Sequence, residues 1–228
     1  MEFKEKIIFQ AFFESTVDMK DVPMFAFVTE SNPHVIRIFE INNAKKDYAP
    51  IVVNEQFNIT DLDINERFIY ATVADARLVY VFKNDFNNYI ENFIIDESIL
   101  NIDHPTFYPV ETILPPRDKN LLIIQNVNSL ILLEITAFTH ELIAQIPLPQ
   151  LSSAFAKCKV VASEESLMVF IRTTGGPDEI LEYGIKDIYN PTLMRSIDLD
   201  GKSLKEGLQV IGISDGNVVA VQTTNLKG

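Results

Sequence analysis

Short apolar runs alternate with short polar stretches along this chain, most clearly between Phe57 and Glu97. Within that segment, Phe68–Ala74, Leu78–Phe82 and Tyr89–Ile95 are rich in β-branched and aromatic residues, which favour the half-buried, pleated surface of a strand. Each run is too short for a helix and is apolar at nearly every position, as in strands covered on both faces. Together with an earlier run around Leu62, the segment predicts four short strands.

Polar residues between these runs predict the turns. Asp61, Asp63 and Asn65 carry side chains that hydrogen-bond nearby backbone and so favour turns over ladders. A second polar stretch, Asp75–Arg77, separates the second run from the third, and Lys83–Asn88 separates the third from the fourth. The four strands are therefore expected to form one antiparallel unit. Nearer the start of the chain, Ser15–Pro23 is predicted to be a polar connection, and Glu30–His34 is predicted to be the turn of a hairpin between Met24–Thr29 and Val35–Ile41.

The rest of the chain repeats this unit more loosely. The third run recurs at Val35–Phe39, Leu78–Phe82, Leu130–Glu134 and Ile180–Gly184, which begin 43, 52 and 50 residues apart. Runs equivalent to the second strand are Met24–Thr29, Phe68–Ala74, Leu121–Gln125 and Leu167–Arg172. Runs equivalent to the fourth strand are Ile51–Asn54, Phe93–Asp96, Leu142–Ile146 and Leu193–Ile197. Periods of roughly 40 to 50 residues with four strands each are typical of β-propeller blades.

The fold class predicted from this repeat is all-β: a β-propeller-like array of four-stranded antiparallel blades, about four and a half in number. Residues 1–228 are interpreted as one such domain, with at most a turn or two of helix. A fifth unit shows only Leu208–Ile213 and Val218–Thr223. A blade needs covered faces and paired edges, and three arrangements would supply them: Ile7–Phe13 completing the last blade of a small ring, a partner chain covering the gap, or further blades in a longer chain. We favour the last, and in that case expect the segment by itself to self-associate through open blade edges.

The second and third runs lie inside each predicted blade, so their inward positions are expected to form the core. The residues predicted to be buried are Ile69, Val73, Val79, Val81, Ile131, Leu133, Val169 and Ile171.

Composition narrows the classes of partner. The net charge of −13 and the pI near 4.6 argue against a nucleic-acid surface, which needs clustered Lys and Arg, and against an anionic membrane leaflet. No run approaches the roughly 20 apolar residues of a spanning helix, so a soluble segment without membrane insertion is expected. The single cysteine slightly favours a reducing, cytoplasmic compartment.

The sequence carries only weak signals for a catalytic nucleophile, a calcium site or a phosphate-binding loop. Cys158 lies in a strand-like run and is interpreted as a small buried residue rather than a nucleophile. Asp61-Leu62-Asp63-Ile64-Asn65 starts like a calcium loop, but Glu66 replaces the glycine expected at the sixth position, so an ordinary polar turn is favoured. Gly175-Gly176 is followed by Pro177 and a strand instead of the helix that a phosphate loop requires.

The three histidines, His34, His104 and His140, are predicted to lie in three different loops without metal-ligand spacing. No catalytic, cofactor-binding or metal-binding residue is therefore assigned, and no cofactor is expected.

Two segments resemble a known family. These are Val35–Asn43 and Tyr183–Leu199, the latter with the turn residues Asp187, Ile188, Asn190 and Pro191, and they resemble the LVIVD-type propeller repeat. The residues Glu40, Ile41 and Asn42 form a weaker copy of the same turn. The resemblance implies a propeller fold and an interaction module at an extracellular or cell surface, which is the alternative to a cytoplasmic location.

The favoured function is a non-catalytic protein-interaction or scaffold module that binds a protein partner through propeller loops. The alternative is a propeller-type hydrolase or lyase with its site at the mouth of the central channel. Inward-facing Asp, Glu and His side chains that converge at that mouth would favour the enzyme, and a channel lined by apolar or Ser/Thr side chains would favour the interaction module.

Overall fold

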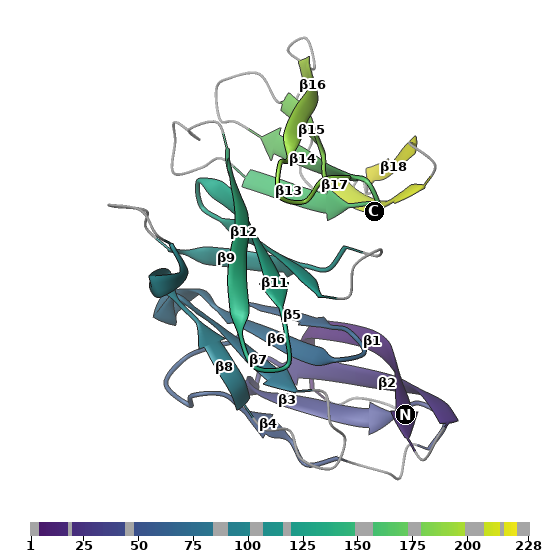
Figure 1. The fold of residues 1–228 in the computed structure, drawn as a ribbon. Helices are drawn as coiled ribbons and strands as arrows, with labels where there is room; N and C mark the ends of the chain where they lie inside the picture. Colours follow the sequence, from purple (N-terminus) through teal and green to yellow (C-terminus); the bar gives the residue numbers. More distant parts are fainter. Residues whose placement is uncertain are drawn as a thin grey trace. The chain divides into compact units, whose positions relative to one another are not determined.

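The chain is described by a computed structural model over residues 5–17, 20–43, 48–83, 91–100, 107–115, 120–148, 157–172, 179–198, 208–214 and 217–222. Within these ranges the regular elements are strands and two single 3₁₀ turns (Figure 1). Over the described residues the strands form four sheets of four strands and one of two, with antiparallel pairing between neighbours such as β1 and β2, β6 and β7, β14 and β15, and β17 and β18. Each four-stranded sheet takes its strands in sequence order, as expected for blades.

The first two sheets hold the strands up to Ile95. The first sheet contains β1 (Ile7–Val17), β2 (Lys20–Thr29), β3 (Asn32–Glu40) and β4 (Ile51–Val52). The second sheet contains β5 (Asp61–Ile64), β6 (Phe68–Val73), β7 (Leu78–Lys83) and β8 (Glu91–Ile95). The 3₁₀ turns are η1 (Ala74–Ala76), between β6 and β7, and η2 (Glu97–Ile99), after β8.

The remaining strands form the other three sheets. The third sheet contains β9 (Pro109–Ile113), β10 (Leu121–Asn126), β11 (Ser129–Ile135) and β12 (His140–Pro147). The fourth contains β13 (Lys157–Ala162), β14 (Ser166–Arg172), β15 (Glu179–Gly184) and β16 (Thr192–Asp198). The two-stranded sheet contains β17 (Leu208–Ser214) and β18 (Asn217–Gln222).

The chain divides into two compact units. Unit 1 comprises residues 1–114, 119–127 and 133–142, and unit 2 comprises residues 115–118, 128–132 and 143–228. The first two sheets therefore lie in unit 1, and the fourth sheet and the two-stranded sheet lie in unit 2. In unit 1 the first strands of successive sheets are neighbours, since β5 contacts both β1 and β9.

Local turn chemistry sets the register of the second sheet. The side-chain oxygen of Asn65 accepts hydrogen bonds from the backbone N–H groups of Arg67 (2.9 Å) and Phe68 (2.8 Å), which closes the β5–β6 turn. Arg77 adopts a left-handed conformation with φ of 57°, which ends η1 and brings Leu78 opposite Val73. Because adjacent residues of a strand point to opposite faces, this register decides which apolar residues face which neighbouring sheet.

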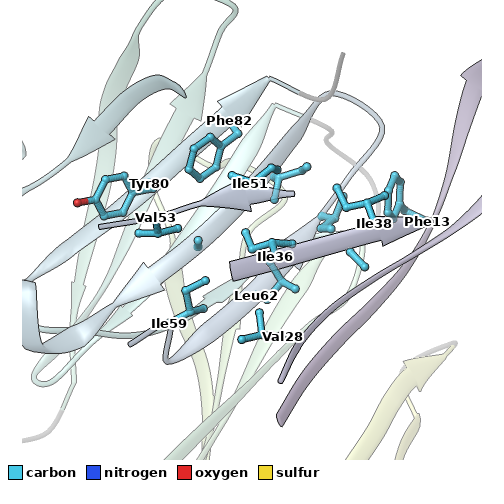
Figure 2. Packing of buried hydrophobic residues seen from close by; sticks show 14 of the residues in the cluster. Phe13, Val28, Ile36, Ile38, Ile51, Val53, Ile59, Leu62, Tyr80 and Phe82 are labelled. Atoms are coloured by element: carbon cyan, nitrogen blue, oxygen red, sulfur yellow. The ribbon is translucent and has the colours of Figure 1, made fainter. Parts of the chain in front are cut away.

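A core cluster of buried apolar residues spans the first and second sheets (Figure 2). Alternate residues of β2 (Met24, Ala26 and Val28) meet alternate residues of β6 (Ile69, Ala71 and Val73), as the period of two in a strand requires. All six residues of β6 are buried, so both faces of this strand are covered. This explains why the sequence of β6 is apolar at nearly every position. A strand buried on one face only would instead alternate apolar and polar residues.

The predicted core is confirmed. All eight residues expected to be buried have exposed fractions of 2% or less: Ile69, Val73, Val79, Val81, Ile131, Leu133, Val169 and Ile171.

Three local predictions were wrong. Within Ser15–Pro23, predicted as a polar connection, Ser15–Val17 instead continue β1 and Lys20–Pro23 begin β2, with Val17 paired to Lys20. Asp61 and Asp63, predicted as turn residues, lie in strand β5, where the ladder with β6 outweighs their turn preference. The turn predicted over Glu30–His34 is confined to Glu30 and Ser31, because β3 already begins at Asn32.

Candidate functional site

Two carboxylates of β5 meet a threonine of β9. The Asp61 Oδ2 atom accepts hydrogen bonds from the backbone N–H of Thr112 (2.7 Å) and from its hydroxyl (3.0 Å). The same hydroxyl lies 3.2 Å from the Asp63 Oδ2 atom. Since a hydroxyl donates one proton at a time, the two carboxylates share a single side-chain donor. Thr112 is 4% exposed, so this polar cluster lies at the edge of the core between the first strands of two sheets.

Two further polar residues lie on the same face of the second sheet. The β5–β6 register places Thr72 opposite Asp61 and Tyr70 opposite Asp63, and cross-strand partners point to the same face. Burial raises the pKa of the Tyr70 hydroxyl well above its ordinary value, against the opposing effects of Asn65 and Arg67. Tyr70 is therefore held neutral at physiological pH, and its hydroxyl can donate a hydrogen bond.

The hydrogen bonds between Asp61 and Thr112 link strand β5 to strand β9 and so have a structural role. Asp61 directs its acceptor oxygen at a backbone N–H and a hydroxyl of the neighbouring sheet, which ties β5 to β9. Within the described residues no group of three or more His, Cys, Asp or Glu side chains is arranged to hold a metal ion. At the inner strands, the acidic side chains of Asp61 and Asp63 meet at the hydroxyl of Thr112. No described histidine side chain joins this cluster.

His140 forms a separate polar feature at the start of β12. Its ring lies 5.0 Å from the ring of Phe93, centroid to centroid, and its buried Nδ1 atom has no hydrogen-bond partner within the described part of the chain. Burial lowers the pKa of His140, although the nearby Asp96 carboxylate opposes this effect. Asp96 caps η2 by accepting the Ser98 N–H at 2.9 Å, and hydrogen bonds from Ser98 lower the pKa of Asp96.

The environment of His140 predicts a pH-dependent stability. Because the pKa of His140 is lower in the folded state than its usual 6.5, the unfolded chain binds more protons in the window just below pH 6.5. The free energy of unfolding should therefore fall as the pH is lowered through this window, and its full value should be present above it.

Urea unfolding at a series of pH values measures this dependence, with His140→Gln as the variant that removes the titrating group. We expect the variant to have a flatter profile between pH 5 and 7. Asp96 acts in a different window, below its ordinary pKa of 3.8, so the two contributions separate. Identical slopes for the wild-type protein and the variant between pH 5 and 7 would show that His140 is solvated.

The other residues considered as candidate sites in the sequence do not belong to the Asp61–Thr112 cluster. Cys158 lies in strand β13, as predicted, and its side chain falls outside the described residues. The histidine prediction was wrong in two cases, because His34 lies within β3 and His140 is the first residue of β12. His104 and Gly175-Gly176 lie outside the described residues. In the parts of the chain that are described, no helix has the length and apolar character needed to cross a bilayer.

The β11–β12 turn presents an aromatic side chain. Phe138 is 93% exposed, although the turn that carries it is closed by hydrogen bonds. The Thr136 N–H donates to the Thr139 carbonyl (2.9 Å), and the Thr139 N–H donates to the Thr136 hydroxyl oxygen (3.1 Å). Phe138 is thus held on a closed turn and points into solvent. Its residue type and loop context are readable from the sequence, but its exposure is not.

Turns from two sheets meet at this end of unit 1. The Ile135 N–H at the end of β11 donates to the Asn120 carbonyl at 2.7 Å, so the Phe138 turn and the start of β10 lie at the same end of the third sheet. The Asn120 side chain in turn accepts a hydrogen bond from the guanidinium of Arg67 in the β5–β6 turn. This surface, defined by Phe138, Asn120 and Arg67, is called the turn surface below.

Comparison with known proteins identifies the architecture. No family model and no curated protein matches the sequence. Among solved structures, the β-propeller domain of Cps50 (Swd1) from Myceliophteria thermophila is 8% identical, with a TM-score of 0.60 over 98% of this chain and 72% of that one. A variant of Kluyveromyces lactis Hsv2, in which a Gly-Ser linker replaces loop 6CD, is 13% identical, with a TM-score of 0.54 over 81% of this chain.

Hydrazine synthase from Kuenenia stuttgartiensis is also similar, at 12% identity and a TM-score of 0.54 over 82% of this chain. This chain spans 58% of the length of the Hsv2 variant and 49% of that of hydrazine synthase. At such identities the likeness concerns the fold alone. The sequential four-stranded antiparallel sheets and these similarities show that the chain has a β-propeller fold.

Proposed function

We propose that this chain is a non-catalytic interaction module that binds a protein partner through the turn surface. The observation that carries the proposal is Phe138, an almost fully exposed aromatic residue on a turn closed by Thr136 and Thr139. Aromatic side chains on preorganised loops supply large contact area with little loss of conformational entropy. The neighbouring Arg67 and Asn120 provide a polar rim of the kind that surrounds such anchors.

The similar proteins are compatible with this proposal without specifying the partner. The Swd1 match is a β-propeller domain of a larger protein. The resemblance of Val35–Asn43 and Tyr183–Leu199 to the LVIVD-type repeat supports an interaction role within the propeller class. Since this chain spans part of the length of the proteins it matches, we also propose that residues 1–228 form one propeller domain within a larger assembly of blades.

The enzyme alternative has one feature in its favour, because Asp61 and Asp63 of the inner strand β5 converge on Thr112 of the neighbouring inner strand β9. The hydrogen bonds to Thr112 use Asp61 as an acceptor that joins two sheets. A general acid or base needs a proton it can exchange with a substrate, and Asp61 directs its Oδ2 atom at protein donors instead. We therefore favour the interaction module.

Affinity capture tests the proposal. The wild-type chain, Phe138→Ser and Val127→Ser are used as baits on extracts of the source cells, and retained proteins are quantified by mass spectrometry. Val127 is 49% exposed in the turn at the opposite end of β11, so it is a matched apolar control. We expect a partner that the wild-type chain and Val127→Ser retain and that Phe138→Ser loses.

Isothermal titration with that purified partner should then show affinity weakened about tenfold or more by Phe138→Ser, the effect of removing a binding hot spot. Equal affinity of Phe138→Ser and the wild-type chain would contradict the role of the turn surface. All three baits should unfold at the same urea concentration, because both side chains are exposed.

A further inference from the structure

The outer strand of the fourth sheet exposes apolar side chains. Leu193 and Met194 are 54% and 64% exposed, Ile197 is 38% exposed, and Tyr189 in the turn before β16 is 62% exposed. These four residues are called the β16 patch. Leu193 pairs with Tyr183 and so lies on one face of the sheet, whereas Ile197 pairs with Ile180 and lies on the other face, as does Met194, whose sulfur lies over Gly184. The patch therefore runs around the open edge of β16. Exposure of this kind does not follow from the outer position alone, because in β12, the outer strand of the third sheet, Leu142 and Ile143 are half-buried and Ile146 is 5% exposed.

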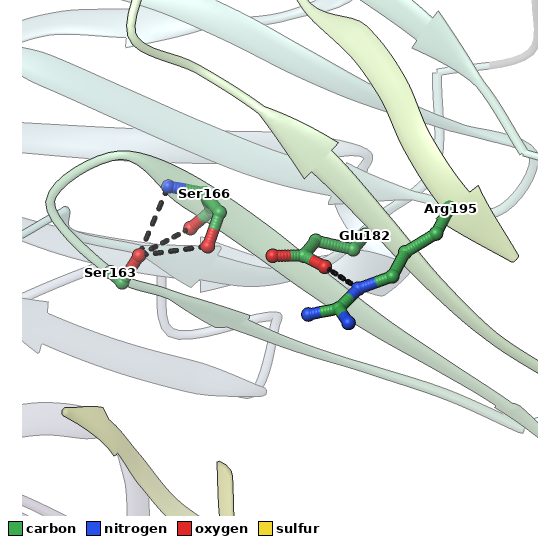
Figure 3. A network of polar contacts seen from close by, with 4 residues as sticks. All are labelled: Ser163, Ser166, Glu182 and Arg195. Atoms are coloured by element: carbon green, nitrogen blue, oxygen red, sulfur yellow. Dashed lines mark hydrogen bonds and ion pairs between the residues drawn. The ribbon is translucent and has the colours of Figure 1, made fainter. Parts of the chain in front are cut away.

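The polar side chains of β16 are already engaged within the sheet. The Arg195 guanidinium pairs with the Glu182 carboxylate of β15 (Figure 3), and the Ser196 hydroxyl donates to the Glu179 carboxylate. Arg195 and Ser196 thus have partners within the sheet, although the Arg195 side chain is still 60% exposed, and the exposed large apolar side chains of β16 are Leu193, Met194 and Ile197. Exposed apolar side chains that cluster in one element mark interaction sites more often than scattered ones do.

The local backbone holds the β16 patch in place. The Tyr189 N–H donates to the Asp187 carboxylate at 3.1 Å, and the Asn190 side chain donates to the same carboxylate at 2.9 Å. A β-bulge follows, because Arg195 pairs with Glu182 while Leu193 already pairs with Tyr183, which leaves Met194 as the extra residue. Bulges re-aim a side chain, and here the Met194 sulfur lies over Gly184, 3.0 Å from where a β-carbon would be.

These features disfavour a second copy of the chain as the occupant. A bulge and a charged residue on an edge strand both hinder edge-to-edge pairing. Antiparallel pairing of β16 with itself around Arg195 would also bring two arginines together. Two chains of net charge −13 repel each other at long range. The β16 patch is therefore suited to side-chain contacts with a different molecule.

Acidic residues gather beside the patch. The Ile185 N–H donates to the Glu165 carbonyl at 2.8 Å, so the β13–β14 and β15–β16 turns lie at the same end of the fourth sheet. The first of these turns is closed by Ser163 and Ser166, whose hydrogen bonds are drawn in Figure 3, and it exposes Glu164 and Glu165. The second exposes Asp187 and Lys186, so three acids face one base at this end.

We infer that the β16 patch binds a basic segment of a partner protein, one that presents apolar side chains flanked by Lys or Arg. Apolar anchors would contact Leu193, Met194 and Tyr189, and the flanking cations would lie near Glu164, Glu165 and Asp187. An apolar centre with a rim of opposite charge is the usual composition of a protein-binding surface, and the rim governs the rate of association and its salt dependence. The inference rests on the proposed function only in assuming a protein partner, and its surface is separate from the turn surface.

Selection from a displayed library of random twelve-residue peptides tests the inference. The wild-type chain is the target, and the double variant Leu193→Ser/Met194→Ser is used for counter-selection. We expect the enriched peptides to carry a net positive charge and two or more large apolar residues. Synthetic versions should bind the wild-type chain and Val127→Ser equally, and the double variant about tenfold more weakly or worse.

A second variant, Glu164→Gln/Glu165→Gln, tests the charged rim without touching an apolar contact. We expect it to weaken peptide binding at low salt and to reduce the dependence of binding on salt. Circular dichroism and urea unfolding establish that both variants fold, and both should, because every substituted side chain is exposed.

Four outcomes would overturn the inference. Peptides that bind the double variant as tightly as the wild-type chain would exclude the β16 patch. Enriched peptides that are neutral or acidic would exclude the basic partner. Sedimentation showing a dimer that Leu193→Ser/Met194→Ser dissociates would assign the patch to a second copy. Peptides whose binding is lost only in Phe138→Ser would refute the β16 patch while supporting the turn surface, so the two proposals can fail separately.

Discussion

Replacing Ile69 by Ala should lower the free energy of unfolding by about 2–4 kcal/mol, the usual cost of removing a large aliphatic side chain from a core. Ile69 is fully buried in β6 and belongs to the cluster that joins the first and second sheets. The substitution both removes transfer free energy and leaves a cavity between two twisted sheets, which relax only partly. The displacement of the urea midpoint, monitored by circular dichroism, gives the loss directly.

Two further variants bracket this result. Ile69→Val, which deletes one methylene, should cost about 0.5–1.5 kcal/mol. Val127→Ala at an exposed turn should stay within about 0.5 kcal/mol of the wild-type chain. If Ile69→Ala and Val127→Ala shifted the midpoint equally, the inward register of β6 would be wrong.

Replacing Asp61 by Ala should lower the free energy of unfolding by about 2–4 kcal/mol. Hydrogen bonds to a charged group contribute about 1.5–3 kcal/mol, and a buried donor left without a partner costs about 1–3 kcal/mol. Asp61→Ala removes the acceptor of the Thr112 N–H and hydroxyl, and Thr112 is 4% exposed, so water reaches these donors poorly. Asp61→Asn keeps an acceptor oxygen and should cost less.

A double-mutant cycle with Thr112→Val separates the hydroxyl from the backbone N–H. Thr112→Val removes only the side-chain donor, so Asp61→Ala should remain destabilising in that background through the unpaired N–H. Asp63→Ala should be the milder of the two aspartate variants, because Asp63 shares one longer contact, of 3.2 Å, with the same hydroxyl. Asp61→Ala as stable as the wild-type chain would show that the link between β5 and β9 contributes nothing.

These experiments also bear on the enzyme alternative. If Asp61 is a structural acceptor, its replacement should act on stability first, and Asp61→Asn should fold. A catalytic aspartate commonly shows the opposite, with its replacement leaving stability unchanged or raised, because active sites are built at the expense of stability. The sign of the stability change for Asp61→Asn therefore distinguishes the two roles before any substrate is known.

Short apolar runs bounded by polar turns were sufficient to predict the strands and their grouping in fours. The reason is local: β-branched and aromatic residues favour strands, Asn and Asp close turns, and the period of the pattern follows from blades of similar length. The same pattern identified the eight central core positions, since the second and third strands of a blade are covered by their neighbours. Propensity and burial agree there, so the sequence was decisive.

Pairing between strands decided whether some segments form strands or turns, where the local residue preferences did not. Asp61 and Asp63 have turn-forming side chains, yet they lie in β5 because β6 supplies their ladder and Thr112 of β9 supplies a donor for their carboxylates. Within the polar stretch Ser15–Pro23, Ser15–Val17 continue β1 and Lys20–Pro23 begin β2 because the two strands pair there. The contact between Asp61 and Thr112 joins residues 51 apart in the chain. The pairing of β1 with β2 is closer in sequence, but it depends on two strands together, so the composition of one short segment encodes neither.

Both proposed surfaces depend on the tertiary structure in the same way. The sequence shows Phe138 and Leu193-Met194 as apolar residues among many, and the equivalent run in β12 is largely covered while β16 is not. The sequence by itself determined an all-β repeat of four-stranded units with its central core. The structure decided which apolar residues remain exposed, because exposure depends on which neighbouring strand or turn covers each position.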